Sequence, residues 1–387
     1  MARLLRPIIA ALAVMLAGTW HPACAASPPE QRNDGWAVAA PETAGFDPAA
    51  LEALAEDIPR GGYGNIHAVL VEHDGRLVFE RYFQGTDEMS GQIMLGTVRF
   101  GPDNLHDLRS VTKSVVALLL GVAVGGEYGQ ALDAPISTYF PDIEGRFSEG
   151  VRRVKLRHVL TMTAGLQWNE MYLPYTNPDN DANRMYGVHD PVVMVLARPV
   201  QDPPGTRWNY STGLSQVVAG LIERRTGKKL RAYADEVLFA PLGIVTYEWL
   251  GARKWGVGGP PAGGSGLRLR PRDLAKIGSL MLHDGVWRGR QVVPAEWIAL
   301  ARQRAVETIP SSPDGTYGYG FTWYPGRLKD GSDLEVFGAK GNGGQRLYVV
   351  PARHLAVTVL AGMYNQRSKG EVERLFRQVL AAQQVVR

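Results

Sequence analysis

The sequence contains a single cysteine, Cys24, close to its amino terminus. A chain processed beyond that position would have no disulfide, no cysteine nucleophile and no thiolate metal site. Histidines are also few, and the eight present are scattered without the close spacing of zinc motifs. Neither a phosphate-binding P-loop nor a Gly-x-Gly-x-x-Gly segment ahead of a helix occurs. The sequence therefore predicts neither a metal nor a cofactor.

An excess of charge of one sign is lacking as well. The chain has 42 basic and 38 acidic residues, a net charge of +4 at pH 7. Removing Arg3 and Arg6 with residues 1–25 would leave 40 basic residues against the 38 acidic ones, a net charge of +2. That balance excludes the strongly basic footprint of a nucleic-acid-binding protein.

The longest apolar run extends from Ile8 to about Trp20, which is too short to span a bilayer comfortably. Basic residues precede it and Ala23-Cys24-Ala25 follows it, so the pattern predicts a signal peptide over 1–25 with cleavage after Ala25. We therefore expect a periplasmic or secreted bacterial protein without a membrane span after cleavage. A buried N-terminal helix and a lipidated Cys24 are the alternatives, and both fit the pattern less well.

Apolar periodicity along the remaining chain predicts a mixed α+β protein. The expected strands are 67–72, 76–83, 319–324, 334–337, 345–350 and 355–361. The expected helices are 47–57, 110–125, 156–162, 190–197, 213–226, 230–238 and 370–383. Hairpin-type connections make the sheet largely antiparallel, assembled from N- and C-terminal segments and flanked by helices.

No linker or internal repeat divides the chain, although the Gly/Pro stretch 256–266 could be a hinge. We expect an N-terminal leader segment over 26–45, loose at its start, and one domain over 46–387. Its sheet region would comprise about 46–125 and 260–387, and an inserted, mostly helical lobe would comprise about 126–259. An active site between these two parts is expected, because clefts between layers commonly hold ligands.

The strongest chemical signal is Ser110-Val111-Thr112-Lys113, the one Ser-x-x-Lys in the sequence, at the head of an apolar helix-like run. Residues three apart share a helix face, so the hydroxyl and the amine can lie side by side. A serine becomes nucleophilic when a neighbouring base takes its proton, and a lysine held neutral can be that base. A helix cap beside a solvated lysine is the structural alternative.

Two further stretches could complete such a site. A Pro-Gly turn leads into an extended segment at Tyr210, just before a helix start at Ser211 or Thr212, which could aim the phenol into a cleft. A nearby lysine cation would lower the pKa of that tyrosine and let it shuttle protons. The glycine-rich segment 338–345 precedes a strand and could supply the second N–H of an oxyanion hole. The alternative for Tyr210 is a tyrosine that only packs and forms structural hydrogen bonds. The alternative for 338–345 is a plain glycine turn between strands.

Trp168, Glu170 and Tyr172 follow a tight turn at Gly165 and are candidates for lining a substrate pocket. An aromatic core cluster with a solvated Glu170 fits the same pattern equally well.

The order of Ser-x-x-Lys, then Tyr210-Ser211-Thr212, then the segment 339–345 resembles the serine β-lactamase, penicillin-binding protein and esterase superfamily. Within it, the chain is most similar to the 6-aminohexanoate-dimer hydrolases and related class C-like hydrolases. The resemblance extends to residues 160–168, 263–267 and 271–275. It implies a β-lactamase/transpeptidase-like fold.

The resemblance also implies roles for individual residues. Ser110 would be the acylated nucleophile and Lys113 its activating base. Tyr210 would shuttle protons to the leaving group and from the deacylating water. The oxyanion hole would consist of the backbone N–H groups of Ser110 and Asn342, with Gly343 one register step away.

Two departures from the family pattern bear on the substrate. Thr212 stands where the family often has Asn, and a hydroxyl lacks the two donors of an amide. Lys340-Gly341 places the cation of the third motif one position off, which disfavours efficient binding of a β-lactam carboxylate. Thr212, Gly341 and Gly343 are still candidate substrate contacts, together with Trp168 and Glu170.

These observations favour an exported serine hydrolase acting on a small-molecule ester or amide, and they leave its oligomeric state open. A β-lactamase or D-amino-acid peptidase is one alternative, which efficient nitrocefin turnover would support. A catalytically silent binding protein on the same scaffold is the other. The absence of a fluorophosphonate adduct would support it.

Overall fold

The computed structural model describes residues 27–90, 93–251, 260–307, 309, 315–328, 332–366 and 368–384. The predicted signal peptide and the first part of the Gly/Pro stretch 256–266 lie outside the described residues. Within the described ranges, no helix is both long and apolar enough to cross a membrane.

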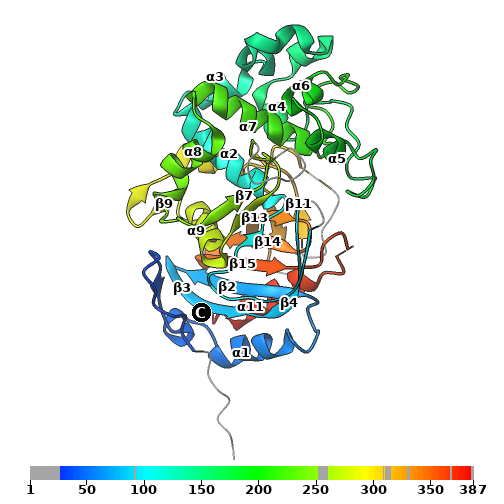
Figure 1. Ribbon diagram of the computed structural model, residues 1–387. Helices are drawn as coiled ribbons and strands as arrows, with labels where there is room; N and C mark the ends of the chain where they lie inside the picture. Colours follow the sequence, from blue (N-terminus) through cyan, green and yellow to red (C-terminus); the bar gives the residue numbers. More distant parts are fainter. Residues whose placement is uncertain are drawn as a thin grey trace, which may run out of the picture.

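An eight-stranded sheet forms one half of the molecule, in the order β1-β3-β2-β15-β14-β13-β12-β11 (Figure 1). Its strands are β1 (Ala37–Val38), β2 (Ile66–His73), β3 (Arg76–Tyr82), β11 (Gly315–Tyr317), β12 (Gly326–Leu328), β13 (Glu335–Gly341), β14 (Gln345–Val350) and β15 (Leu355–Ala361). Neighbours are antiparallel except for β1 beside β3. The neighbouring strands β2 and β15 join the N-terminal and C-terminal parts of the sheet.

Helices cover both faces of this sheet. Helices α1 (Pro48–Asp57) and α11 (Glu371–Ala382) pack together on one face, where blue and red segments adjoin in Figure 1. The apolar stripe of α11 is buried, as its periodicity predicts, and Phe376 stacks on Tyr348 of β14. Helix α9 (Pro271–Leu282) packs on the other face, against β15 and β14. Strands β2 and β15 are almost wholly buried because they lie between these two layers.

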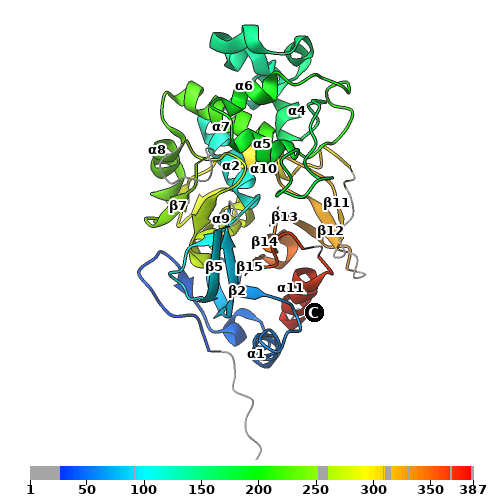
Figure 2. The ribbon, with the colours of Figure 1, turned by 45° about the vertical axis from the view of Figure 1, so that its right-hand side comes forward.

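The middle of the sequence forms a helical lobe, drawn in green above the sheet in Figures 1 and 2. Its helices are α3 (Tyr128–Asp133), α4 (Leu156–Leu160), α5 (Asp181–Tyr186), α6 (Pro191–Leu196), α7 (Thr212–Thr226) and α8 (Leu230–Ala234). Helix α2 (Val111–Val124) is buried along nearly its whole length and packs against α7. Because α2 also contacts β13, it connects the lobe to the sheet.

Shorter elements complete the fold. The additional strands are β4 (Gln84–Met89), β5 (Ile93–Arg99), β6 (His106–Asp107), β7 (Tyr247–Trp249), β8 (Leu267–Leu269), β9 (Val286–Trp287) and β10 (Arg290–Gln291). Strands β4 and β5 pair as a hairpin, β9 and β10 form a second small sheet, and β6, β8 and β7 form a third. The remaining helical elements are α10 (Ala295–Arg302), η1 (Pro41–Ala44), η2 (Ile136–Tyr139), η3 (Pro141–Arg146), η4 (Glu149–Arg153), η5 (Asp235–Phe239) and η6 (Pro351–Arg353).

The predicted α+β architecture with a largely antiparallel sheet is confirmed, and two local predictions are wrong. Residues 319–324 form turns instead of a strand: the Gly320 N–H donates to the Trp323 carbonyl, and Thr322 has a φ of 61°. The predicted leader segment 26–45 is not separate from the domain, because from Trp36 onward it is part of the core and the sheet. Trp36 is buried and its indole donates to the Arg272 carbonyl, while Ala37–Val38 adds a strand to the sheet.

Candidate active site

Ser110 and Lys113 lie in the first turn of α2, as their spacing predicts. Ser110 is the N-cap residue, and the Lys113 Nζ atom is 3.1 Å from its Oγ atom. The same amine donates a hydrogen bond of 2.7 Å to the Gly264 carbonyl. Lys113 is only 2% exposed, so its amine is directed into the protein and toward the serine, away from bulk water.

A strained turn presents the serine. Arg109, directly before it, has a φ of 49°, a left-handed conformation that costs energy in a residue with a side chain. The Asp107 carboxylate stabilises this turn by accepting hydrogen bonds from the Arg109 and Ser90 N–H groups. Strained backbone held by buried hydrogen bonds is typical of residues placed for chemistry.

Burial changes the proton affinity of the lysine. Removal from water lowers the pKa of Lys113 from its usual 10.5 to about 8, opposed only by attraction to the Glu170 carboxylate. A neutral amine that donates one N–H to the Gly264 carbonyl can turn its lone pair toward the Ser110 hydroxyl. The geometry and the lowered pKa therefore suit a base that accepts the serine proton.

Tyr210, about 100 residues further along the chain, reaches the same point. Its ring centroid is 5.0 Å from the Lys113 Nζ atom, and the Ser110 side chain lies close enough to the phenol to influence its pKa. The expectation of a lowered tyrosine pKa is wrong: burial, together with repulsion from Tyr324 and Glu170, raises the pKa of Tyr210 well above 10. A neutral phenol can donate a proton, so the site favours Tyr210 as an acid beside Lys113 as the base.

Glu170 and Trp168 do not line a substrate pocket, contrary to the prediction. Glu170 is 1% exposed, and its carboxylate accepts hydrogen bonds from the Trp168 indole, the Tyr175 phenol, and both the N–H and the hydroxyl of Thr212. Nor is it a solvated carboxylate. Its charge lies at the N-terminus of α7, where the helix dipole favours an anion, and it fixes the segment that carries Tyr210.

The proposed oxyanion donors face one cavity. Ser110 and Asn342 both line it, and Asn342 lies in the turn between β13 and β14. Among the hydrogen bonds of the described residues, none is donated by the backbone N–H of Ser110 or of Asn342. Both groups are therefore able to bind a developing negative charge.

Gly341 and Gly343 border a neighbouring hollow instead of the cavity at Ser110, so their predicted substrate contact is not supported. A Cβ at position 341 would lie 2.5 Å from the Leu108 carbonyl, so glycine is required for β13 to approach the segment that leads to Ser110. Gly343 has a φ of 94°, which allows the turn. Lys340 lies outside the cavity as well and stacks on the Tyr317 ring, with its Nζ atom 3.6 Å from the centroid.

Thr212 lines the cavity as predicted, but its hydroxyl proton is donated to Glu170. Its oxygen is thus available to a substrate mainly as an acceptor. Tyr172, by contrast, is 82% exposed and is not part of the cavity wall.

Several cavity residues were not singled out from the sequence as site residues. The remaining wall consists of Ser90, Arg109, Tyr175, Ala182, Asn183, Tyr186, Gly264 and Ser265. Gly264 has the clearest structural reason for its identity, because a Cβ there would lie 2.6 Å from Thr212 and 3.3 Å from the Lys113 amine. The glycine-rich run Gly263-Gly264-Ser265-Gly266 was the one sequence feature that could have drawn attention to Gly264. It did not show that Gly264 contacts Lys113.

A family model described as Beta-lactamase matches residues 60–383. The chain belongs to this family. The esterase EstB of Burkholderia gladioli is 30% identical over 185 residues, which cover 46% of this chain and 45% of the esterase. The 6-aminohexanoate-dimer hydrolase of Paenarthrobacter ureafaciens is 27% identical over 207 residues, which cover 51% of each chain. The chain thus spans about half the length of these two relatives.

Solved structures support the same fold. A family VIII carboxylesterase superposes with a TM-score of 0.67 at 17% identity, covering 86% of this chain and 96% of the esterase chain. At that identity the likeness shows the fold alone. The named relatives of this beta-lactamase-family chain are hydrolases of ester and amide bonds.

Proposed function

We propose that this chain is a serine hydrolase that cleaves carboxylic esters or small amides through an acyl-enzyme on Ser110. The observation that carries the proposal is the 3.1 Å contact between the Ser110 hydroxyl and a buried Lys113 amine whose pKa is lowered to about 8. The proximity of Tyr210 to the same hydroxyl supports it. A silent binding protein would have no need to retain a desolvated lysine beside a strained serine turn.

In acylation, neutral Lys113 accepts the hydroxyl proton while the Ser110 Oγ atom attacks the carbonyl carbon. The carbonyl oxygen becomes an oxyanion, which the N–H groups of Ser110 and Asn342 stabilise. Tyr210 gives its phenolic proton to the departing alkoxide or amine and is reprotonated by Lys113. In deacylation a water attacks the acyl carbon and its proton passes to Lys113 through Tyr210. Lys113 then gives that proton to the departing Ser110 oxygen, which restores the free hydroxyl.

The charge of the cavity favours neutral or anionic substrates. Arg109 and Lys113 line it, whereas no Asp or Glu is among the described residues of its wall. Arg109 is ion-paired with Glu88 at 3.0 Å and Lys113 is neutral in the reactive state, so the wall carries little net charge, but it offers a cationic acyl group no carboxylate partner. We therefore expect succinyl esters to be better substrates than aminoacyl esters of the same length.

The test is turnover of p-nitrophenyl esters, with intact-mass detection of a fluorophosphonate adduct on the peptide that contains Ser110. Ser110→Ala should abolish the adduct and lower the rate by roughly 10³-fold or more while the protein remains folded. The matched control is Ser148→Ala, which removes a hydroxyl bonded to the Arg198 carbonyl in the helical lobe. Unchanged turnover in Ser110→Ala would disprove the proposal.

A second candidate function is hydrolysis of β-lactams or of D-amino-acid peptides. It is favoured by a relative named D-aminopeptidase from Brucella anthropi, 27% identical over 209 residues that cover 36% of that protein. Nitrocefin and D-alanine p-nitroanilide, assayed beside the esters, separate the two functions. Higher kcat/KM for either of these would reverse the order of preference.

We also propose export to the periplasm or the medium, on the basis of the basic, apolar and small-residue pattern of residues 1–25. Fractionation of the native host and the mass of the mature chain test this proposal. A mature chain that begins after Ala25 is the expected result, and an intact cytoplasmic chain would contradict it.

A further inference from the structure

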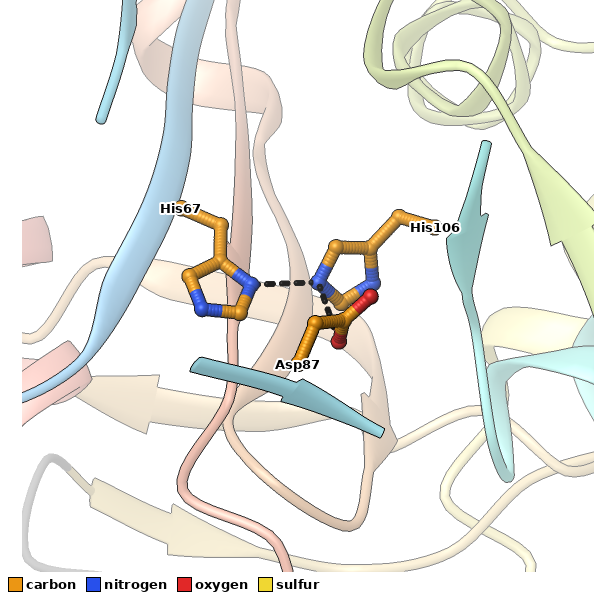
Figure 3. Close-up of side chains that lie close together, drawn as sticks. All are labelled: His67, Asp87 and His106. Atoms are coloured by element: carbon orange, nitrogen blue, oxygen red, sulfur yellow. Dashed lines mark hydrogen bonds and ion pairs between the residues drawn. The ribbon is translucent and has the colours of Figure 1, made fainter. Parts of the chain in front are cut away.

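Three buried polar side chains meet outside the active-site cavity: His67 on β2, Asp87 on β4 and His106 on β6 (Figure 3). They are 0%, 2% and 0% exposed. The His67 Nδ1 atom lies 2.8 Å from His106 Nε2, which lies 3.9 Å from Asp87 Oδ1. One ligand atom from each residue lies within 4.8 Å of the other two, and Figure 3 shows His67 and Asp87 each in contact with His106.

The outer nitrogen of each imidazole faces an oxygen that can only accept a hydrogen bond. His106 Nδ1 lies 3.1 Å from the Asp107 carbonyl, and His67 Nε2 lies 3.1 Å from Asn65 Oδ1. The Asn65 amide is oriented because its nitrogen donates to the Thr86 carbonyl at 2.8 Å. Both outer nitrogens therefore carry the ring proton, and in neutral rings both inner nitrogens present lone pairs to each other.

Two lone pairs at this distance, beside a carboxylate, repel one another unless a cation lies among them. We propose that this cluster binds one Zn²⁺ through His67 Nδ1, His106 Nε2 and the Asp87 carboxylate. Imidazole nitrogen and carboxylate oxygen are zinc ligands. A ligating histidine whose other N–H is held by an oxygen is also the usual second-shell arrangement. A shared extra proton is the competing occupant.

The separations approach those of a tetrahedral zinc centre. Ligand atoms bound at about 2.0–2.1 Å in a tetrahedron are about 3.3 Å apart. Two of the three separations, 2.8 and 3.9 Å, lie on either side of that value and differ from it by about half an ångström. The third, between His67 Nδ1 and the Asp87 carboxylate, is at most 4.8 Å and would shorten by up to about 1.5 Å on binding zinc. The Tyr364 phenol orients Asp87 with a 2.7 Å hydrogen bond, and the Phe100 ring stacks on His67 with centroids 4.1 Å apart.

This zinc would tie together three strands that lead to the nucleophile. His106 directly precedes Asp107, whose carboxylate holds the turn at Arg109. None of the three ligands is among the residues that line the cavity, so the metal would act as a structural support and would not touch the substrate. The inference is independent of the proposed hydrolase activity, because its test measures metal.

The experiment is the zinc content of the purified full chain, measured by inductively coupled plasma mass spectrometry after gel filtration. We expect about one zinc per chain in the wild type and less than a tenth of that in His106→Ala and Asp87→Asn. The matched control, His189→Ala, removes an exposed histidine and should leave the zinc content unchanged. Full zinc content in His106→Ala would place the metal elsewhere and overturn the proposal.

A second measurement decides the question if the variants fail to fold. Chelator-treated wild type is titrated with Co²⁺ and with Zn²⁺. We expect visible absorption bands of tetrahedral Co²⁺ that Zn²⁺ abolishes, and a melting temperature raised by several degrees with Zn²⁺. A wild type that is purified without metal, shows no bands and does not change its melting temperature would overturn the proposal in favour of the shared proton.

Discussion

The rate of acylation should depend on a single proton, the one on the Lys113 amine. Burial lowers the pKa of Lys113 to about 8, and only the neutral amine can accept the serine proton. At pH 7 an amine with that pKa is roughly one-tenth neutral, against roughly 0.03% for an ordinary lysine. Burial thus raises the fraction of usable base roughly three-hundredfold at neutral pH.

We therefore expect kcat/KM for p-nitrophenyl butyrate to rise about tenfold per pH unit below pH 8 and to level off above it. This rising limb of the pH profile is measured from initial rates that are corrected for spontaneous hydrolysis. The pH range is limited to values at which the protein stays folded. Lys113→Arg should lose both the limb and the activity, because a guanidinium stays protonated. The matched control is Lys229→Met, whose side chain is 88% exposed and remote from the site. A flat profile in the wild type would refute the reasoning.

The same pKa predicts a stability effect with a definite sign. The folded pKa lies below the unfolded one, so below pH 8 the folded state must hold a desolvated cation, at a cost of about 3 kcal/mol. That cost falls as the pH rises from 8 toward 10.5. Lys113→Met removes the charge but also two hydrogen bonds, and we expect it to be about 1–2 kcal/mol more stable than wild type at pH 7. Chemical denaturation measures the difference, and a less stable variant would contradict the assigned burial cost.

Four further substitutions test individual contacts. Tyr210→Phe should lower kcat by roughly 10²–10⁴-fold in the ester assay without loss of the folded state, because it removes only the phenolic hydroxyl and keeps the ring. Gly264→Ala should reduce kcat/KM at least about tenfold, since the new methyl group would press on Thr212 and on the lysine amine. Glu170→Gln should destabilise the protein by roughly 2–4 kcal/mol in denaturation, because an amide cannot accept all four hydrogen bonds. Trp36→Ala should cost roughly 3–5 kcal/mol in the same measurement if the first described segment belongs to the core, whereas a change within about 0.5 kcal/mol would restore the idea of a loose leader.

The sequence predicted that Ser110, Lys113 and Tyr210 lie close together, because a fixed spacing and an order along the chain identify them, and the structure brings them together. It could not show the role of Glu170, whose partner Thr212 lies 42 residues away and contacts it only after folding. The prediction of a strand over 319–324 was wrong for a related reason. The aromatic residues of this segment alternate as in a strand, but Tyr319 packs on Trp208 in the irregular segment before α7, a contact that the local sequence does not reveal.

The residues of the proposed zinc cluster are also distant in the sequence and meet only in the folded chain. His67, Asp87 and His106 are 20 and 19 residues apart and lie on three different strands, so no short motif reveals them. The sequence predicts no metal because zinc motifs are recognised by ligands that are close together along the chain. Antiparallel strands and hairpins instead bring together residues at separations set by strand and loop lengths.

Helix packing explains how residues about 100 positions apart form one reacting centre. Ser110 caps α2, Ser211 caps α7, and the two helices pack against each other along buried faces. The first turn of α2 therefore carries Lys113, and the segment leading directly into α7 carries Tyr210, to the vicinity of the same hydroxyl. Dispersion and apolar burial along α2 and α7 offset the cost of desolvating the lysine, so the charge need not be paired with a carboxylate that would raise its pKa. Glu170 contributes an attraction to Lys113 that is weaker than the effect of burial, and this balance leaves the amine able to exchange its proton near neutral pH.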